Sequence, residues 1–118
     1  LMYAEAAVRS NSDLSVALGY VNELRIKRNA PQVTEEEIKA TVDDIPYKFF
    51  LDERARELYW EGVRRTDLIR FDAFTSDKYI WQWKGGVADG KAINSKFNVY
   101  PIPSTELSAN PNLFNELY

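Results

Sequence analysis

The chain has 118 residues, of which 45% are hydrophobic and 28% charged, and its formal net charge is −3. This length and composition are typical of one small globular domain, and the lack of a basic excess argues against a nucleic-acid partner. The chain contains no cysteine and no histidine, which excludes disulfides, thiol catalysis, histidine-dependent catalytic triads and zinc sites built on those residues.

Residues 1–29 carry the pattern of a helical hairpin. Leu18, Val21 and Leu24 recur at helical spacing, and the polar segment 11–13 separates them from an earlier helical stretch. That earlier stretch begins inside a helical pattern, with no initiator methionine or signal peptide before it. We therefore expect the chain to be a piece of a longer protein, whose targeting signals would lie outside it.

A short helix is predicted over residues 34–42. Thr34 and Glu37 have the spacing of a capping box, in which each side chain accepts a hydrogen bond from the backbone of the other residue. The segment Asp43-Asp44-Ile45-Pro46 then interrupts the helical pattern and separates this helix from the next one.

A long helix is predicted over residues 46–72. Its apolar residues, Trp60 among them, lie on two opposite faces, which is typical of a helix packed between two layers. Gly62 lies in the interior of this helix and costs up to about 1 kcal/mol relative to alanine. We therefore expect a kink or a close neighbour at Gly62.

Helical periodicity is absent from residues 75–98, which predicts a long irregular loop. Tyr79, Trp81 and Trp83 lie in this region and would share one face if the chain were extended there. They are candidate ligand contacts, because an aromatic ring can stack on the apolar face of a sugar. The alternative is that these rings anchor the loop on the helical core. Acidic residues nearby lack the spacing of a calcium loop, so no metal is expected.

Two motifs in this order carry a resemblance to a known family. The segment Glu53-Arg54-Ala55-Arg56-Glu57-Leu58, followed by Glu61-Gly62-Val63-Arg64-Arg65-Thr66-Asp67-Leu68-Ile69-Arg70, resembles the ER-x-x-EL…EG-x-R-x-x-DL-x-R signature of the SusD/RagB family. Residues 99–118 form a tail in which Tyr100-Pro101-Ile102-Pro103…Glu106-Leu107…Asn110-Pro111…Leu113 is similar to the closing PIP…EL…NP motif of that family. Tyr3-Ala4-Glu5-Ala6 resembles an AEA segment that precedes both motifs. At the very end, only Asn115 and Tyr118 match the QNPGY ending of many members.

The resemblance implies a mainly α-helical, SusD-like fold: a tetratricopeptide-like helical hairpin, a long helix and long irregular covering loops. This chain would be its C-terminal portion. Members of the family are lipoproteins of the Gram-negative outer membrane that bind glycans or other nutrients beside a SusC-like TonB-dependent transporter. They have no catalytic activity and need no cofactor. The lipid anchor, the only membrane attachment, would lie on an N-terminus outside this chain. The sugar-contacting residues of the family lie largely in segments absent here, so the resemblance assigns no binding residue.

A charged stripe follows the predicted long helix. Its members are Arg54, Glu57, Glu61, Arg64, Arg65, Asp67 and Arg70. Several are three or four residues apart, which permits ion pairs along a helix. Two other interpretations stay open: the arginines could hold an anionic ligand, and Glu57 with Glu61 could be the acid and base of a glycoside hydrolase. Adjacent arginines favour the ionised carboxylate, whereas a general acid needs a raised pKa, so we favour structural ion pairs.

The leading functional hypothesis is a non-catalytic glycan- or nutrient-binding subunit of an outer-membrane uptake system. The alternative is a helical scaffold that mainly contacts the transporter, since helical repeats commonly bind other proteins. A glycoside hydrolase is the least favoured interpretation.

Overall fold

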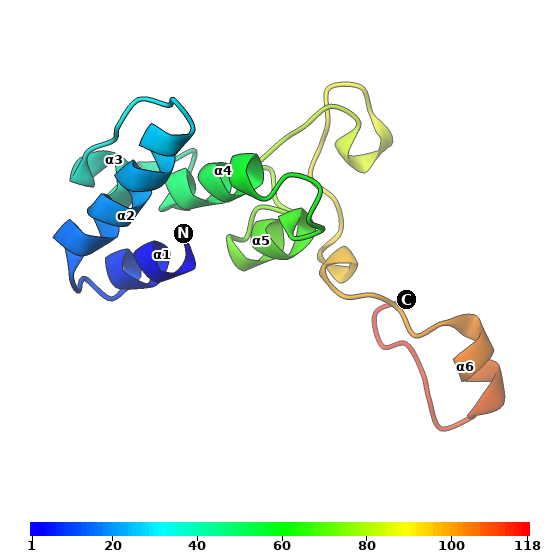
Figure 1. Cartoon of the computed structure of the whole chain (residues 1–118). Coiled ribbons are helices and arrows are strands. Elements are labelled where there is room, and N and C mark those ends of the chain that lie inside the picture. The colour runs from blue at the N-terminus through cyan, green and yellow to red at the C-terminus, as the bar shows by residue number, and fades with distance from the viewer. The chain divides into compact units, whose positions relative to one another are not determined.

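The structure, a computed structural model, describes all 118 residues and is mainly α-helical (Figure 1). This confirms the predicted fold class. The helices and strands are α1 (Met2–Arg9), α2 (Leu14–Lys27), α3 (Glu35–Lys39), β1 (Thr41–Val42), β2 (Ile45–Pro46), α4 (Lys48–Glu57), α5 (Arg64–Arg70) and α6 (Ser104–Ala109), with 3₁₀ turns η1 (Lys84–Gly86) and η2 (Ser95–Asn98). The chain divides into two compact units, Leu1–Ala73 and Phe74–Tyr118. None of its helices combines the length and the hydrophobicity needed to cross a lipid bilayer.

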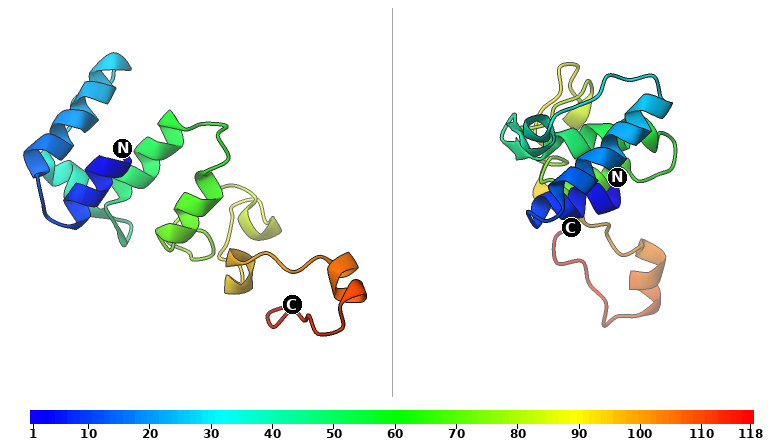
Figure 2. Two further views of the ribbon diagram at one scale, coloured as in Figure 1. Left: turned by 60° about the horizontal axis from the view of Figure 1, so that its bottom comes forward. Right: turned by 60° about the vertical axis from the view of Figure 1, so that its left-hand side comes forward.

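The first two helices, α1 and α2, pack side by side as a hairpin, as the sequence predicts (Figure 2). Small apolar residues fill their interface, and the buried ones are Ala4, Ala7, Val8, Ala17 and Val21. Asn11 and Asp13 in the connecting turn have positive φ angles of 54° and 45°. Asparagine and aspartate tolerate this left-handed conformation better than most residues, which explains the polar break between the helices.

Helix α3 begins with the predicted capping box. The backbone N–H of Glu37 donates to Thr34 Oγ1 at 3.3 Å, and the backbone N–H of Thr34 donates to Glu37 Oε2 at 2.7 Å. The helix ends at Lys39, so the predicted extent of residues 34–42 is wrong at its C-terminal end.

A two-stranded hairpin replaces the end of that predicted helix. Strands β1 and β2 pair in antiparallel register, with Val42 opposite Ile45. Asp43 and Asp44 form the turn with φ angles of 52° and 57°, as a type I′ hairpin turn requires. The β-branched Val42 also favours an extended backbone over a helix.

The predicted long helix over residues 46–72 is wrong as a single element, because the structure has two helices there, α4 and α5. Trp60 and Gly62, in the connection between them, have φ angles of 67° and 76°, which a right-handed helix cannot contain. A side chain at position 62 would meet no atom within 4 Å. Glycine is therefore favoured at position 62 by the positive φ angle at the break between the helices, and not by a close neighbour. Trp60 is 87% exposed, so its expected burial on an apolar face is also wrong.

The interior of unit Leu1–Ala73 is built from large apolar side chains of several elements. The fully or nearly fully buried ones outside the α1–α2 interface are Ile38, Ile45, Phe50, Leu51, Leu68 and Phe71. The side chain of Asn22 in α2 forms two hydrogen bonds with the backbone of Val33. Asn22 Nδ2 donates to Val33 O at 2.9 Å, and the N–H of Val33 donates to Asn22 Oδ1 at 2.8 Å. These bonds fix the connection that leads into α3.

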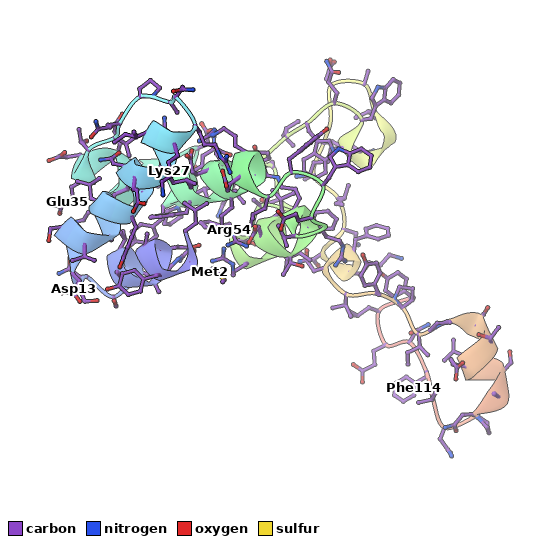
Figure 3. All side chains as sticks on the ribbon, viewed as in Figure 1. Met2, Asp13, Lys27, Glu35, Arg54 and Phe114 are labelled. Carbon is purple, nitrogen blue, oxygen red and sulfur yellow. The ribbon has the colours of Figure 1, made fainter.

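Unit Phe74–Tyr118 contains no α-helix or β-strand before α6, in agreement with the irregular loop predicted over residues 75–98. Its tail is held by Asn115, which accepts from Ile102 N–H at 2.7 Å and donates to Ile102 O at 3.2 Å. The hydroxyl of Tyr118 donates to Val99 O at 2.8 Å. Asn115 and Tyr118 are the two residues that match the family's ending, and both hold the tail in place. Phe114, labelled in Figure 3, stays 69% exposed.

Candidate functional site

Residues 74–93 form a closed loop, which we call the aromatic loop. The N–H of Ile93 donates to Thr75 O at 2.9 Å and closes its base. Nearer its tip, the N–H of Lys91 donates to Lys84 O at 3.0 Å. The two halves of the loop therefore bond to each other without forming regular strands.

Two glycines allow the aromatic loop to fold tightly on itself. Gly85 has φ 66°, and a Cβ at this position would lie only 2.8 Å from Lys91 Cγ. Gly90 has φ 76°, and a Cβ there would clash with the carbonyl oxygen of Trp81. Only glycine combines this conformation with this close approach of neighbouring atoms.

The three candidate aromatic residues all lie in this loop but differ in exposure. Trp83 is 69% exposed, Trp81 is 36% exposed, and Tyr79 is half-buried. Trp83 has a left-handed backbone with φ 67°, so the stretch is not extended and the expected alternation on one face does not apply. The three rings therefore do not share one exposed face, and Trp83 is the most exposed of them.

The ring of Trp81 is engaged by neighbours within its own unit. Phe74 stacks on it, with ring centroids 6.2 Å apart and planes inclined by 24°. Lys84 Nζ lies 4.6 Å from the Trp81 centroid, a distance typical of a cation–π contact. These contacts favour an anchoring role for Trp81 and leave Trp83 as the more open ring.

Lys84 is a residue that sequence reasoning missed. Its side chain is almost completely buried, with only 2% of the residue exposed. Its ammonium donates to Ser76 O at 2.5 Å and to Tyr79 O at 2.7 Å. Burial lowers the pKa of Lys84 below its ordinary value, while the charge of Asp77 acts in the opposite direction. Lysine is almost never fully buried without partners, so a lysine in an irregular loop is expected to be exposed. Neither composition nor spacing indicated that Lys84 would be buried.

In unit Leu1–Ala73, an ion-pair network joins α1, α4 and α5. Arg54 Nε donates to Asp67 Oδ2 at 2.8 Å, and Arg70 Nη2 donates to Asp67 Oδ1 at 3.1 Å. Arg70 also donates to both carboxylate oxygens of Glu5, which accepts from Arg9 Nε at 2.8 Å as well. Figure 3 shows Arg54 where α4 faces α5. The structure thus brings Arg54, Asp67 and Arg70 together with Glu5, a partner that lies 65 residues from Arg70 and that spacing alone could not reveal.

The remaining members of the predicted stripe do not pair along one helix. Glu57 receives two bonds from Arg28, at 2.6 and 3.0 Å. Arg64 Nη1 donates to Leu51 O at 2.8 Å, and Arg65 is half-buried. Glu61 is exposed and forms no ion pair. The break between α4 and α5 explains this, because it removes the helical spacing on which the stripe depends.

A third buried acidic residue is Glu53, the first residue of the ER segment quoted above. It is 6% exposed and accepts from Arg25 Nη1 at 2.7 Å and from Arg56. Arg25 belongs to α2 and Glu53 to α4, so this pair links the helical hairpin to the next part of the unit.

Glu57 is poorly suited to act as a general acid. The hydrogen bonds from Arg28 hold the pKa of Glu57 below its ordinary value, whereas a general acid needs a raised pKa. The ion pair with Arg28 therefore argues against the glycoside hydrolase interpretation. No group of three or more acidic side chains is placed to hold a metal ion.

A groove of about 450 Å³ opens beside the break between α4 and α5, and sequence reasoning missed it. It is lined by Ala55, Leu58, Tyr59, Trp60, Gly62, Val63, Arg64 and Asp67. The rings of Tyr59 and Trp60 meet edge to face, with centroids 6.2 Å apart. Both side chains are strongly exposed, so the groove presents aromatic surface to solvent.

The buried carboxylate of Glu5 gives an expected pH dependence. Burial by itself would raise the pKa of Glu5, but the hydrogen bonds and charges of Arg70 and Arg9 outweigh it and lower the pKa below 4.5. A carboxylate whose pKa is lowered by folding contributes stability that is present above its unfolded pKa and lost as the pH falls through the folded pKa. The free energy of unfolding should therefore decrease on acidification below about pH 4.5.

Urea unfolding at a series of acidic pH values tests this expectation. Glu5→Gln should be less stable than wild type near neutral pH and should lose less stability on acidification. Glu61→Gln, which changes an exposed carboxylate with no ion pair, should keep the wild-type dependence. If the free energy of unfolding of Glu5→Gln fell on acidification as steeply as that of wild type, Glu5 would not be the source of the pH dependence.

Comparison with known proteins places the chain in a family. The family model described as the SusD family matches residues 1–118. The chain is 42% identical over 117 residues to the starch-binding protein SusD of Bacteroides thetaiotaomicron. This alignment covers 96% of the chain and 18% of that relative, so the chain spans less than a fifth of the relative's length. With a family match over its whole length, the chain belongs to the SusD family.

Proposed function

We propose that the protein containing this chain is a non-catalytic glycan-binding subunit of an outer-membrane nutrient-uptake system. The observation that carries the proposal is the 42% identity to a starch-binding protein over 96% of this chain. Starch or a related α-glucan is therefore the ligand to test first. The ion pair that holds Glu57 ionised, described above, supports binding without hydrolysis.

Within this chain, Trp83 is the proposed contact with the glycan. An exposed indole offers a flat apolar surface to the C–H face of a sugar ring and keeps an N–H group for hydrogen bonding. Tyr79 and Trp81 share the aromatic loop, but they are more buried than Trp83. We place them beneath the contact surface rather than on it.

The proposed partner in the membrane is a SusC-like TonB-dependent transporter, and the proposed location is the bacterial surface, through a lipid anchor outside this chain. Family membership supports both proposals. The two compact units leave several aromatic side chains exposed, among them Tyr59, Tyr100 and Phe114. Such side chains are enriched in protein interfaces.

The function is tested with the full-length protein and its Trp83→Ala variant. Wild type should be retarded by soluble starch in affinity electrophoresis and should release no shorter sugars from it. Trp83→Ala should weaken binding of maltoheptaose, a short starch fragment, by at least about fivefold, because one aromatic stacking contact is worth about 1 kcal/mol. Isothermal titration calorimetry measures this change. In addition, a tagged protein purified from solubilised outer membranes should bring a transporter with it.

Trp60→Ala is the matched control, since Trp60 is also exposed and has the same φ of 67°. It should keep wild-type affinity. Release of sugars by the pure protein would contradict the non-catalytic function. An equal loss of affinity in both variants would show that Trp83 is not a specific contact.

A further inference from the structure

The ammonium group of Lys84 joins three points of the aromatic loop. It donates to the carbonyl oxygens of Ser76 and Tyr79 and lies over the ring of Trp81. Removing an ammonium group from water is unfavourable unless well-placed polar groups replace the lost hydration. The buried charge therefore favours loop conformations that keep these carbonyls in place.

The neighbouring residue, Trp83, has a backbone conformation that needs such support. A bulky residue at φ 67° is strained, and such strain persists only where the surrounding contacts fix the conformation. Backbone bonds bracket Trp83 on both sides: its N–H donates to Ala88 O at 3.2 Å, and the N–H of Lys84 donates to Trp81 O at 3.1 Å. In this conformation, the Trp83 indole stays 69% exposed.

We propose that Lys84 is a positioning residue that fixes the aromatic loop in the conformation presenting the Trp83 indole to solvent, and that Trp81 belongs to this support. The proposal rests on the proposed function for the identity of the ligand as a glycan. Lys84 is buried and acts through Trp83 rather than by touching the ligand.

Fixing the loop before binding explains why a buried lysine would affect affinity. A ligand that binds a mobile ring must also order it, and each immobilised side chain or loop reduces the net binding free energy. A Trp83 ring that is already held in its binding conformation avoids much of this loss. Replacing Lys84 should therefore weaken binding even though the indole remains present.

Lys84→Met in the full-length protein tests the proposal, because methionine keeps an apolar stem of similar length and removes the three N–H donors. Its affinity for maltoheptaose should fall by about fivefold or more, as in Trp83→Ala. The double variant should bind no more weakly than Trp83→Ala alone, since Lys84 acts through Trp83. The exposed Lys91 provides the matched control, and Lys91→Met should keep wild-type affinity.

Backbone amide exchange gives a readout that does not depend on the ligand. The amides of Lys91 and Ile93, which close the loop, should exchange faster in Lys84→Met, while the amides of α2 exchange at the wild-type rate. If Lys84→Met does not fold, as judged by its helical circular dichroism, Lys84→Gln replaces it, because glutamine keeps hydrogen-bond donors but lacks the charge and the reach.

Wild-type exchange at Lys91 and Ile93 in the Lys84 variant would overturn the proposal. A further loss of affinity in the double variant, beyond that of Trp83→Ala, would also overturn it. If Trp83→Ala itself leaves affinity unchanged, the glycan contact under the proposed function fails. Faster exchange in Lys84→Met would in that case still support Lys84 as the residue that positions the loop.

Discussion

Replacing Asp67 with alanine is expected to destabilise unit Leu1–Ala73 by about 3–5 kcal/mol. Asp67 is 3% exposed and accepts from both Arg54 and Arg70. Its removal would leave Arg54, only 9% exposed, as a buried charge without its carboxylate, and an uncompensated buried charge is far more costly than a broken surface pair. Urea unfolding followed by circular dichroism at 222 nm, a standard helix wavelength, measures the loss.

The control for Asp67 is the exposed pair of Lys27 with Glu23, whose side chains are 68% and 59% exposed. Glu23→Ala should change the free energy of unfolding by less than about 1 kcal/mol, because solvent screens surface ion pairs. If Asp67→Ala were as mild as this control, the network would have no role in stability.

Phe50→Ala is expected to produce a loss of similar size, about 3–5 kcal/mol. Phe50 is 0% exposed and meets Phe49 edge to face, with centroids 5.4 Å apart. Truncation removes a large buried apolar surface and leaves a cavity that the surrounding helices can fill only in part. The same unfolding measurement applies.

Tyr59, which is 76% exposed, gives the matched aromatic control for Phe50. Tyr59→Ala should alter the free energy of unfolding by no more than about 0.5 kcal/mol, since exposed side chains contribute little to stability. Equal effects in the two variants would show that Phe50 does not lie in the core. Either large loss would be a substantial part of the 5–15 kcal/mol typical of a folded domain.

The residues that mark the family are also those that hold the helices together. Arg54 belongs to the ER segment of the signature, and Asp67 and Arg70 belong to its DL-x-R segment. Glu5, from the preceding AEA segment, completes the same network. The motif therefore describes a packing arrangement of α1, α4 and α5.

Features that depend on neighbouring residues could be predicted from the sequence. The helical hairpin follows from apolar residues three and four positions apart, and the capping box follows from the spacing of Thr34 and Glu37. The irregular region before the tail follows from the absence of any such period. In each case, the interacting groups lie within one or two turns of the chain.

Features that depend on distant residues required the tertiary structure. The helical pattern continues through Trp60 and Gly62, so it conceals the break that left-handed backbone angles impose there. The pairing of Glu5 with Arg70, 65 residues away, was equally hidden. The burial of Lys84 and the exposure of Trp83 depend on the irregular path of the aromatic loop, which no periodic pattern reveals. By itself, the sequence determined the family, the mainly helical class, the hairpin of α1 and α2 and the capping box of α3. Only the folded path of the chain decided which charges meet and which rings face solvent, because burial and ion pairing depend on how that path brings groups together, and no helical or strand period records it.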